Sequence, residues 1–158
     1  MPMGAIRTLA SLKHFAHCYL INSGKTHSAL QSFAAAESSV YLGPLRLLAH
    51  EVYERMNKND VECNLLTGED RKESSHVTKW ACTIEMAPLN KKFDVAVIDE
   101  IQVIADRDRG SAWTNALLGL QASKIHICGE ESAVDLVQDL CNMTGDKLTV
   151  QPFFKILG

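Results

Sequence analysis

Residues 93–102 read Phe-Asp-Val-Ala-Val-Ile-Asp-Glu-Ile-Gln, and these ten residues carry the strongest signal for the fold class. From Val95 to Ile98 the chain is continuously apolar and rich in β-branched side chains, which is typical of a strand buried on both faces. Asp99 and Glu100 follow directly, at the carboxyl end of that strand. Since α/β proteins bind ligands at this edge of a sheet, the stretch predicts a central strand that ends at a functional site.

Short apolar runs and helical patterns alternate along the rest of the chain. Strands are predicted at residues 15–20, 39–42, 63–66, 77–83, 93–98, 124–128 and 148–151. Helices are predicted at residues 27–36, 44–56, 111–120 and 132–142, the second with Pro44 at its first position. This alternation is the pattern of βαβ units around a parallel sheet. We therefore predict an α/β fold with a three-layer parallel sheet.

Composition limits the class of protein. A chain of 158 residues, 46% hydrophobic and 22% charged, is typical of one globular domain. The net charge of -3 excludes a strong, diffuse basic surface, so nucleic acid would have to be bound by local groups. Five cysteines without a CxxC pair predict reduced, mostly buried thiols. No apolar run approaches the roughly 18 residues of a membrane span, so we expect no membrane contact.

The segment Asn22-Ser23-Gly24-Lys25-Thr26 resembles the second half of a phosphate loop. Such a loop needs backbone N–H groups at a helix N-terminus, a lysine for the phosphates and a hydroxyl for Mg²⁺. The first glycine of the motif is replaced by Tyr19, which lacks the backbone freedom of glycine. On these residues alone, a phosphate loop and a chance SGKT at an ordinary helix start are both open.

Asp99 and Glu100 add a second signal for a nucleotide site. In P-loop ATPases an acidic residue at the end of a core strand holds Mg²⁺, and a neighbouring glutamate can orient the attacking water. Their position downstream of Lys25, in a βαβ pattern, favours a single nucleotide site, functional or decayed.

Three further loops are expected at the carboxyl edge of the sheet, at residues 41–46, 66–70 and 82–86. They offer small residues, hydroxyls and backbone N–H groups, which can bind a sugar-phosphate backbone without reading bases. Ordinary strand-to-helix turns with glycine and threonine would have the same composition, so both interpretations stay open.

Read in order, these motifs resemble a known family. The quoted segments are NSGKT, YLGPLRLLAHEVYE, CNLLTGED, SHVTKWACTIEM, FDVAVIDEIQ, DRGSAWTNALLGL and IHICGE. Together they are similar to the first RecA-like domain, a P-loop NTPase domain, of the mitochondrial degradosome RNA helicases, which are DExH-like members of superfamily 2. The resemblance runs from about residue 15 to residue 151.

The resemblance implies ATP and Mg²⁺ as cofactors and gives each motif a role. Lys25 would bind the phosphates, and Thr26 and Asp99 would hold the magnesium. Glu100 would position or deprotonate the hydrolytic water, and Gln102 would couple the nucleotide state to the RNA surface.

The resemblance also implies RNA as a partner. The motif formed by Gly129 and Glu130 would link hydrolysis to unwinding. In this family the helicase partners an exoribonuclease in the mitochondrial matrix and takes part in RNA turnover. The residues expected along the RNA backbone are Pro44, Arg46, Thr67, Gly68 and Thr83.

Two departures from the family pattern shape the expected domain organisation. The family's loop GPTNSGKT maps onto residues 19–26, so Tyr19, Leu20 and Ile21 replace its glycine, proline and threonine. We expect residues 1–14 to be an N-terminal extension and residues 15–158 to be the RecA-like ATP-binding domain, with the second helicase domain and its arginine fingers absent. Such a domain alone should hydrolyse ATP poorly, because arginine fingers contribute orders of magnitude to phosphoryl transfer.

Three functions are therefore compared. The leading hypothesis is an ATP-dependent RNA helicase domain. A thymidine-kinase-like phosphotransferase would also combine SGK[ST] with a DE-x-Q strand end, but the CxxC pairs of its zinc site are missing here. The third is a non-catalytic RNA- or protein-binding remnant with a degenerate phosphate loop.

Overall fold

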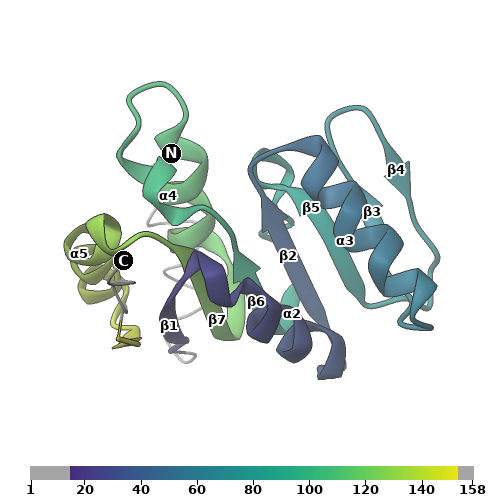
Figure 1. Ribbon diagram of the computed structural model, residues 1–158, viewed down its shortest axis with the longest axis horizontal. Coiled ribbons are helices and arrows are strands. Elements are labelled where there is room, and N and C mark those ends of the chain that lie inside the picture. The colour runs from purple at the N-terminus through teal and green to yellow at the C-terminus, as the bar shows by residue number, and fades with distance from the viewer. Residues whose placement is uncertain (1–14, 153–158) are drawn as a thin grey trace, which may run out of the picture.

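A sheet of eight strands runs through the computed structural model, which describes residues 15–152 (Figure 1). The strand order is β4-β3-β5-β2-β6-β7-β1-β8, and every neighbouring pair is parallel except the antiparallel pair β3–β4. The proposed N-terminal extension, residues 1–14, and the last residues, 153–158, lie outside the described part. The strands are β1 (His17–Asn22), β2 (Ser39–Gly43), β3 (Asn64–Leu66), β4 (Arg71–Lys72), β5 (Lys79–Thr83), β6 (Lys92–Ile98), β7 (Gln121–Gly129) and β8 (Lys147–Val150).

Helices cover both faces of this sheet. Buried side chains of α2 and α3 share one apolar cluster, and those of α4 and α5 share the other. In α3 the buried residues Ala49, Val52 and Met56 recur at helical spacing, as expected for one face turned to a sheet. No helix among the described residues has the length and apolar character to cross a membrane. The helices are α2 (Thr26–Ala35), α3 (Arg46–Lys58), α4 (Gly110–Gly119) and α5 (Val134–Thr144), with 3₁₀ segments η1 (Ser23–Lys25), η2 (Ile84–Met86), η3 (Ile101–Ala105) and η4 (Glu131–Ala133).

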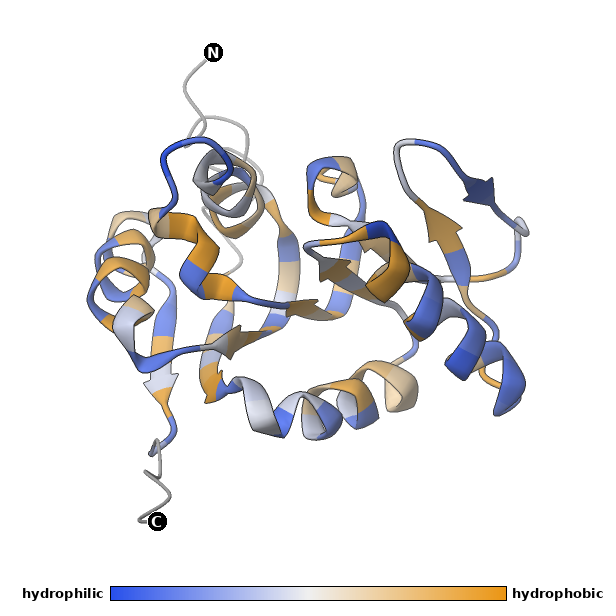
Figure 2. Cartoon of the chain, turned by 45° about the horizontal axis from the view of Figure 1, so that its top comes forward, coloured by the Kyte–Doolittle hydropathy of each residue, from blue (hydrophilic) through white to orange (hydrophobic). Residues whose placement is uncertain are grey.

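Strand β6 is buried on both faces, as its sequence predicts. Val97 packs in the cluster with α2 and α3, whereas Ala96 and Ile98 pack in the cluster with α4 and α5. All three are fully buried. Successive side chains of a strand point to opposite faces, and helices cover both faces of this sheet. Figure 2 shows hydrophobic central strands and a hydrophilic outer side on α3 and β4. The predicted α/β class and three-layer parallel sheet are confirmed.

The boundaries of several elements differ from the prediction. Strand β1 runs on to Asn22 rather than ending at residue 20, because it pairs with β7 as far as the contact between Asn22 and Gly129. Helix α3 begins at Arg46, so the prediction that Pro44 is a first helical residue is wrong; Leu45, between them, is still extended. The short edge strand β4 was not predicted, since two exposed charged residues carry no hydrophobic pattern. Most other ends shift by one to three residues.

All five cysteines are buried and none forms a disulfide. This confirms the prediction of reduced, buried thiols from the odd number of cysteines and the absence of a CxxC pair. Their packing in the two apolar clusters makes most of them small hydrophobic residues of the core.

Replacing Val97 by Asp is expected to destabilise the domain by several kcal/mol, because a carboxylate would lie unpaired between β6 and the helices. Lys92→Asp introduces the same residue at an exposed position of the same strand and serves as the control. Chemical denaturation followed by circular dichroism measures both. A Val97→Asp protein that unfolds at the same denaturant concentration as Lys92→Asp would show that β6 is not a central strand.

Candidate nucleotide and nucleic-acid edge

Three strands bring the predicted nucleotide residues to one edge. Strand β7 lies between β6 and β1 and is parallel to both, so the three carboxyl ends point the same way. Asn22 ends β1 opposite Gly129 of β7, and Ile98 ends β6 opposite Ile127 of β7. The segments 22–26, 99–102 and 129–130 therefore lie next to one another, although the sequence separates them widely.

The phosphate-loop segment is short and held by its own side chains. The Asn22 carboxamide oxygen accepts a hydrogen bond from the Gly24 N–H at 2.9 Å. The Thr26 hydroxyl donates to the Ser23 carbonyl at 2.7 Å. Helix α2 starts at Thr26, so its N-terminus faces the same edge, where backbone N–H groups favour anions. Lys25 is exposed beside it.

Residues 19–21 do not form the opening turn of a phosphate loop. They belong to β1, where Leu20 and Ile21 are buried. The ring of Tyr19 stacks on those of His17 and His126, with centroids 4.1 and 5.4 Å apart. In this structure residues 19–21 therefore continue the strand, as predicted for residues 19 and 20, and Ser23–Lys25 lie between it and α2. The strand continues because it pairs with β7 as far as Asn22.

Asp99 is buried at the end of β6, and hydrogen bonds hold both its oxygens. The Tyr41 hydroxyl donates to Oδ2 at 2.8 Å, and the Glu100 N–H donates to Oδ1 at 3.0 Å. Burial raises the pKa of Asp99 above its ordinary value, whereas these two donors lower it by stabilising the charged form. Tyr41 was quoted in a motif but not predicted as a site residue. Its only signal in the sequence is a hydroxyl within an apolar strand.

Thr26 and Asp99, the predicted magnesium residues, lie just beyond the ends of β1 and β6, the two strands that flank β7. Burial raises the pKa of Cys128 to about 12, and the negative charge of Asp99 adds to that effect. A hydrogen bond with Thr26 opposes it. Both side chains thus influence the pKa of one thiol near the end of β7. One carboxylate and one hydroxyl fit Mg²⁺, which takes oxygen ligands and is usually bound through few protein groups together with phosphates and water.

Glu100 and Gln102 lie beside the end of β7. Glu100 adopts a left-handed backbone conformation, with φ 53° and ψ 48°, which is uncommon for a residue other than glycine and typical of functional sites. The Gln102 amide donates to the Glu100 carboxylate, and the Gln102 Oε1 atom is buried without a partner. A Cβ atom on Gly129 would lie 2.6 Å from that oxygen, so only glycine fits there. Glu130, next in the chain, is exposed.

The predicted RNA residues lie at the same edge, farther along the sheet. Pro44 follows β2, Thr67 and Gly68 follow β3, and Thr83 ends β5. These strands are neighbours, with Gly43 opposite Thr83 and Leu66 opposite Cys82. The Thr83 hydroxyl is buried without a partner, and Gly68 faces open space.

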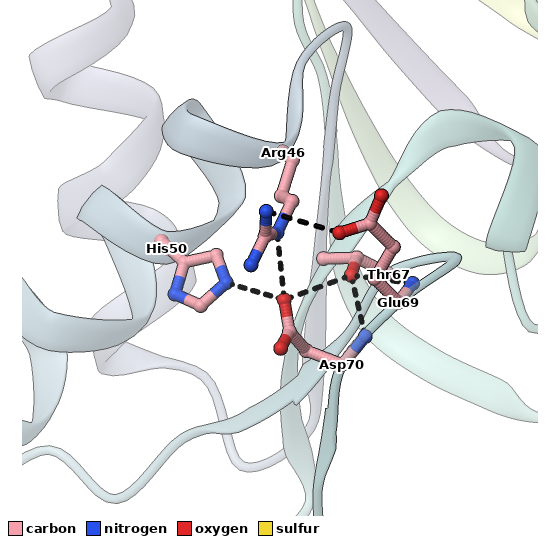
Figure 3. Close-up of polar contacts among 5 residues, drawn as sticks. All are labelled: Arg46, His50, Thr67, Glu69 and Asp70. Atoms are coloured by element: carbon pink, nitrogen blue, oxygen red, sulfur yellow. Dashed lines mark hydrogen bonds and ion pairs between the residues drawn. The ribbon is translucent and has the colours of Figure 1, made fainter.

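Arg46, in the first turn of α3, contacts the loop after β3. Its Nη1 lies 3.0 Å from a Glu69 oxygen, and its Nε donates to Asp70 at 2.8 Å. His50 and Thr67 also contact Asp70 (Figure 3). The Asp70 carboxylate thus joins Arg46 to Thr67, and neither Asp70 nor Glu69 was predicted as a site residue.

Trp113 and Arg109 connect the two parts of the edge. The Trp113 indole N–H donates to the Asp99 carbonyl at 2.9 Å. The Arg109 guanidinium lies over the Trp113 ring, 5.3 Å from its centroid, and donates to the Pro44 carbonyl at 2.8 Å. Trp113 is buried in the core, and its polar contact could be found only in the structure.

Known proteins similar to this chain are helicases. The family model described as the DEXQ-box helicase domain of Suv3 matches residues 6–153. The mitochondrial ATP-dependent RNA helicase SUV3 of Saccharomyces cerevisiae is 50% identical over 142 residues, which are 85% of this chain and 19% of that protein. The human mitochondrial ATP-dependent RNA helicase SUPV3L1 is 49% identical over 142 residues, 85% of this chain and 18% of that protein. The chain thus spans about a fifth of the length of these relatives.

Solved structures support the RecA-like fold. The C-terminal domain of S. cerevisiae Dbp5 superposes with a TM-score of 0.56 at 13% identity, covering 87% of this chain and 90% of that one. The Pyrococcus furiosus Hef helicase domain superposes with a TM-score of 0.54 at 12% identity, covering 94% of this chain and 38% of that one. At such low identity the likeness concerns the fold alone.

Tyr41→Phe is expected to raise the pKa of Asp99 further, because the hydroxyl that stabilises the carboxylate is lost. At a mildly acidic pH a larger fraction of Asp99 would then be protonated. NMR titration of the ¹³C-labelled carboxyl groups measures this pKa. Tyr53→Phe, which removes a hydroxyl on α3 away from Asp99, is the control; equal Asp99 titration curves in the two variants would contradict the role of Tyr41.

Proposed function

Because the chain belongs to the family of the DEXQ-box helicase domain of Suv3, we propose that it is the ATP-binding part of an ATP-dependent RNA helicase. The observation that carries the proposal is the meeting of two motifs at one edge. Helix α2 starts at Thr26 just after β1, and Asp99 directly follows β6; these two strands flank β7 and end at the same edge of the sheet. This arrangement suits a nucleoside triphosphate whose phosphates lie between the two segments.

In this proposal the phosphate loop and the α2 N-terminus bind the triphosphate. Backbone N–H groups of residues 22–26 and the ammonium group of Lys25 supply positive charge to it. Thr26 and Asp99 would hold Mg²⁺, which when bound neutralises charge on the phosphate oxygens. Tyr41 keeps the Asp99 carboxylate oriented through the hydrogen bond to Oδ2.

Glu100 and Gln102 then serve hydrolysis and its coupling to RNA. Glu100 would accept a proton from the attacking water or orient it. Gln102 contacts both Glu100 and the end of β7 at Gly129, which supports a role in passing the nucleotide state to Gly129 and Glu130. The contact of Arg109 with Pro44 supports a second connection, through Trp113, from Asp99 to the RNA residues.

RNA would lie along the ends of β2, β5 and β3. The groups there are hydroxyls, a glycine and one guanidinium, which suit phosphates and sugars rather than base edges. A backbone contact of this kind lets a helicase move along RNA of any sequence. The residues proposed for it are Pro44, Arg46, Thr67, Gly68 and Thr83.

The activity of the whole protein is also part of the proposal. We take residues 15–158 as one RecA-like domain that needs arginines from a second such domain for efficient hydrolysis. The relatives are named as mitochondrial RNA helicases, which supports unwinding of RNA in mitochondria. The family resemblance adds the matrix as the site of RNA turnover and an exoribonuclease as the partner.

One observation favours a second candidate, a non-catalytic RNA- or protein-binding module. Strand β1 continues to Asn22, so only Ser23–Lys25 separate it from α2. A loop this short offers fewer N–H groups to enclose phosphates than the full eight-residue motif. Binding of ATP distinguishes the two candidates.

Titration of the chain with a fluorescent ATP analogue and Mg²⁺ is expected to give saturable binding that Lys25→Ala weakens at least about tenfold, the effect of losing a charge-assisted contact of 1.5–3 kcal/mol. Lys58→Ala, at the exposed end of α3, is the matched control and should bind as the parent does. Absence of binding in the parent would favour the non-catalytic module. Binding that Lys25→Ala retains would place the nucleotide elsewhere on the chain.

A further inference from the structure

Five residues form a polar cluster beside the residues proposed for RNA, here called the Arg46 cluster: Arg46, His50, Thr67, Glu69 and Asp70 (Figure 3). Its basic groups come from α3 and its hydroxyl and carboxylates from the loop after β3. Arg46 and Thr67 are the two members assigned to the RNA backbone under the proposed function. Both therefore already contact an acidic side chain in this structure.

The two carboxylates of the cluster are held very differently. Asp70 has a side chain 25% exposed and accepts from the Nε of Arg46, from His50 at 2.8 Å and from the Thr67 hydroxyl at 3.3 Å. Its own N–H donates back to the Thr67 hydroxyl at 2.9 Å. The bonds from His50 and Arg46 lower the pKa of Asp70 to about 2. Asp70 thus stays charged and joins α3 firmly to the loop.

Glu69 makes a looser contact. Its side chain is 72% exposed, and its ion pair is with the Nη1 of Arg46. An exposed ion pair of this kind contributes little free energy, because water and salt screen it. It can therefore open at small cost.

A guanidinium binds a carboxylate and a phosphate through the same N–H groups. A backbone phosphate that approaches Arg46 at this edge meets a guanidinium whose Nη1 is occupied by Glu69 and whose Nε is held by Asp70. The phosphate can replace the exposed Glu69 while Asp70 keeps the arginine in place.

We propose that Glu69 competes with RNA phosphate for Arg46 and so limits RNA affinity, whereas Asp70 is a positioning residue that keeps Arg46 at the RNA edge. The proposal rests on the proposed function, because it requires Arg46 to contact RNA. Such competition would favour release of RNA, which a translocating helicase needs at every step.

The test is a double-mutant cycle on binding of a short fluorescein-labelled oligouridine, followed by anisotropy at about 0.1 M salt, where the Debye length is about 10 Å. Glu69→Gln is expected to tighten binding about two- to five-fold, the range for loss of an exposed ion pair. In the Arg46→Gln background the change Glu69→Gln should leave RNA binding unchanged, because the guanidinium for which Glu69 and the phosphate compete is absent. Asp70→Ala should weaken RNA binding, because Arg46 loses the residue that positions it, even though the change also removes a negative charge.

Glu62→Gln is the matched control. Glu62 precedes β3 at the opposite edge, is 68% exposed, and pairs with His76 at 3.1 Å. It should leave RNA binding unchanged. If Glu62→Gln and Glu69→Gln tighten binding equally, the loss of one negative charge explains both effects, and the inference is overturned. Tightening by Glu69→Gln that persists without Arg46, or tighter binding by Asp70→Ala, would also overturn it. An Arg46→Gln protein that binds like the parent, or a parent that does not bind, would instead contradict the RNA contact in the proposed function and the inference with it.

Discussion

The parallel pairing of β6, β7 and β1 fixes where the motifs of the candidate site can lie. Parallel strands present all their carboxyl ends at one edge of the sheet. The ends of β1 and β6 therefore lie at the same edge, one on each side of β7. The start of α2 and the Asp99–Gln102 segment follow these ends directly. Close packing of Gly129 against Ile101 and Gln102 leaves no room for a side chain between them.

Burial of Asp99 joins this edge to the core. A carboxylate at such a position loses hydration, which the Tyr41 hydroxyl and the Glu100 N–H replace with fixed donors. Because Tyr41 belongs to β2 and packs with α2 and α3, the orientation of Asp99 depends on the packing of that face. Trp113, from the opposite face, donates to the carbonyl of the same residue. Side chains from both faces of the sheet therefore hold Asp99.

The residues proposed to bind RNA belong to a chain whose net charge is negative. The chain carries a net charge of -3, so it cannot attract RNA by an overall positive field. Under the proposed function, RNA would be bound by local groups such as Arg46, and the neighbouring Glu69 and Asp70, which pair with it, would set how available that group is.

Local sequence was enough to predict the α/β class, the buried strand β6, the carboxylates at its end and the helical segments, because these depend on local periodicity and on neighbours along the chain. It also carried the family motifs. The extension of β1 through Ile21 to Asn22 could be found only in the folded chain, since that end is set by pairing with β7. The same holds for Tyr41 and Asp99, which are 58 positions apart, and for Arg46 and Asp70, which are 24 apart. Such partners leave no mark on local pattern, because hydrogen bonds and ion pairs depend on distance in space rather than along the chain.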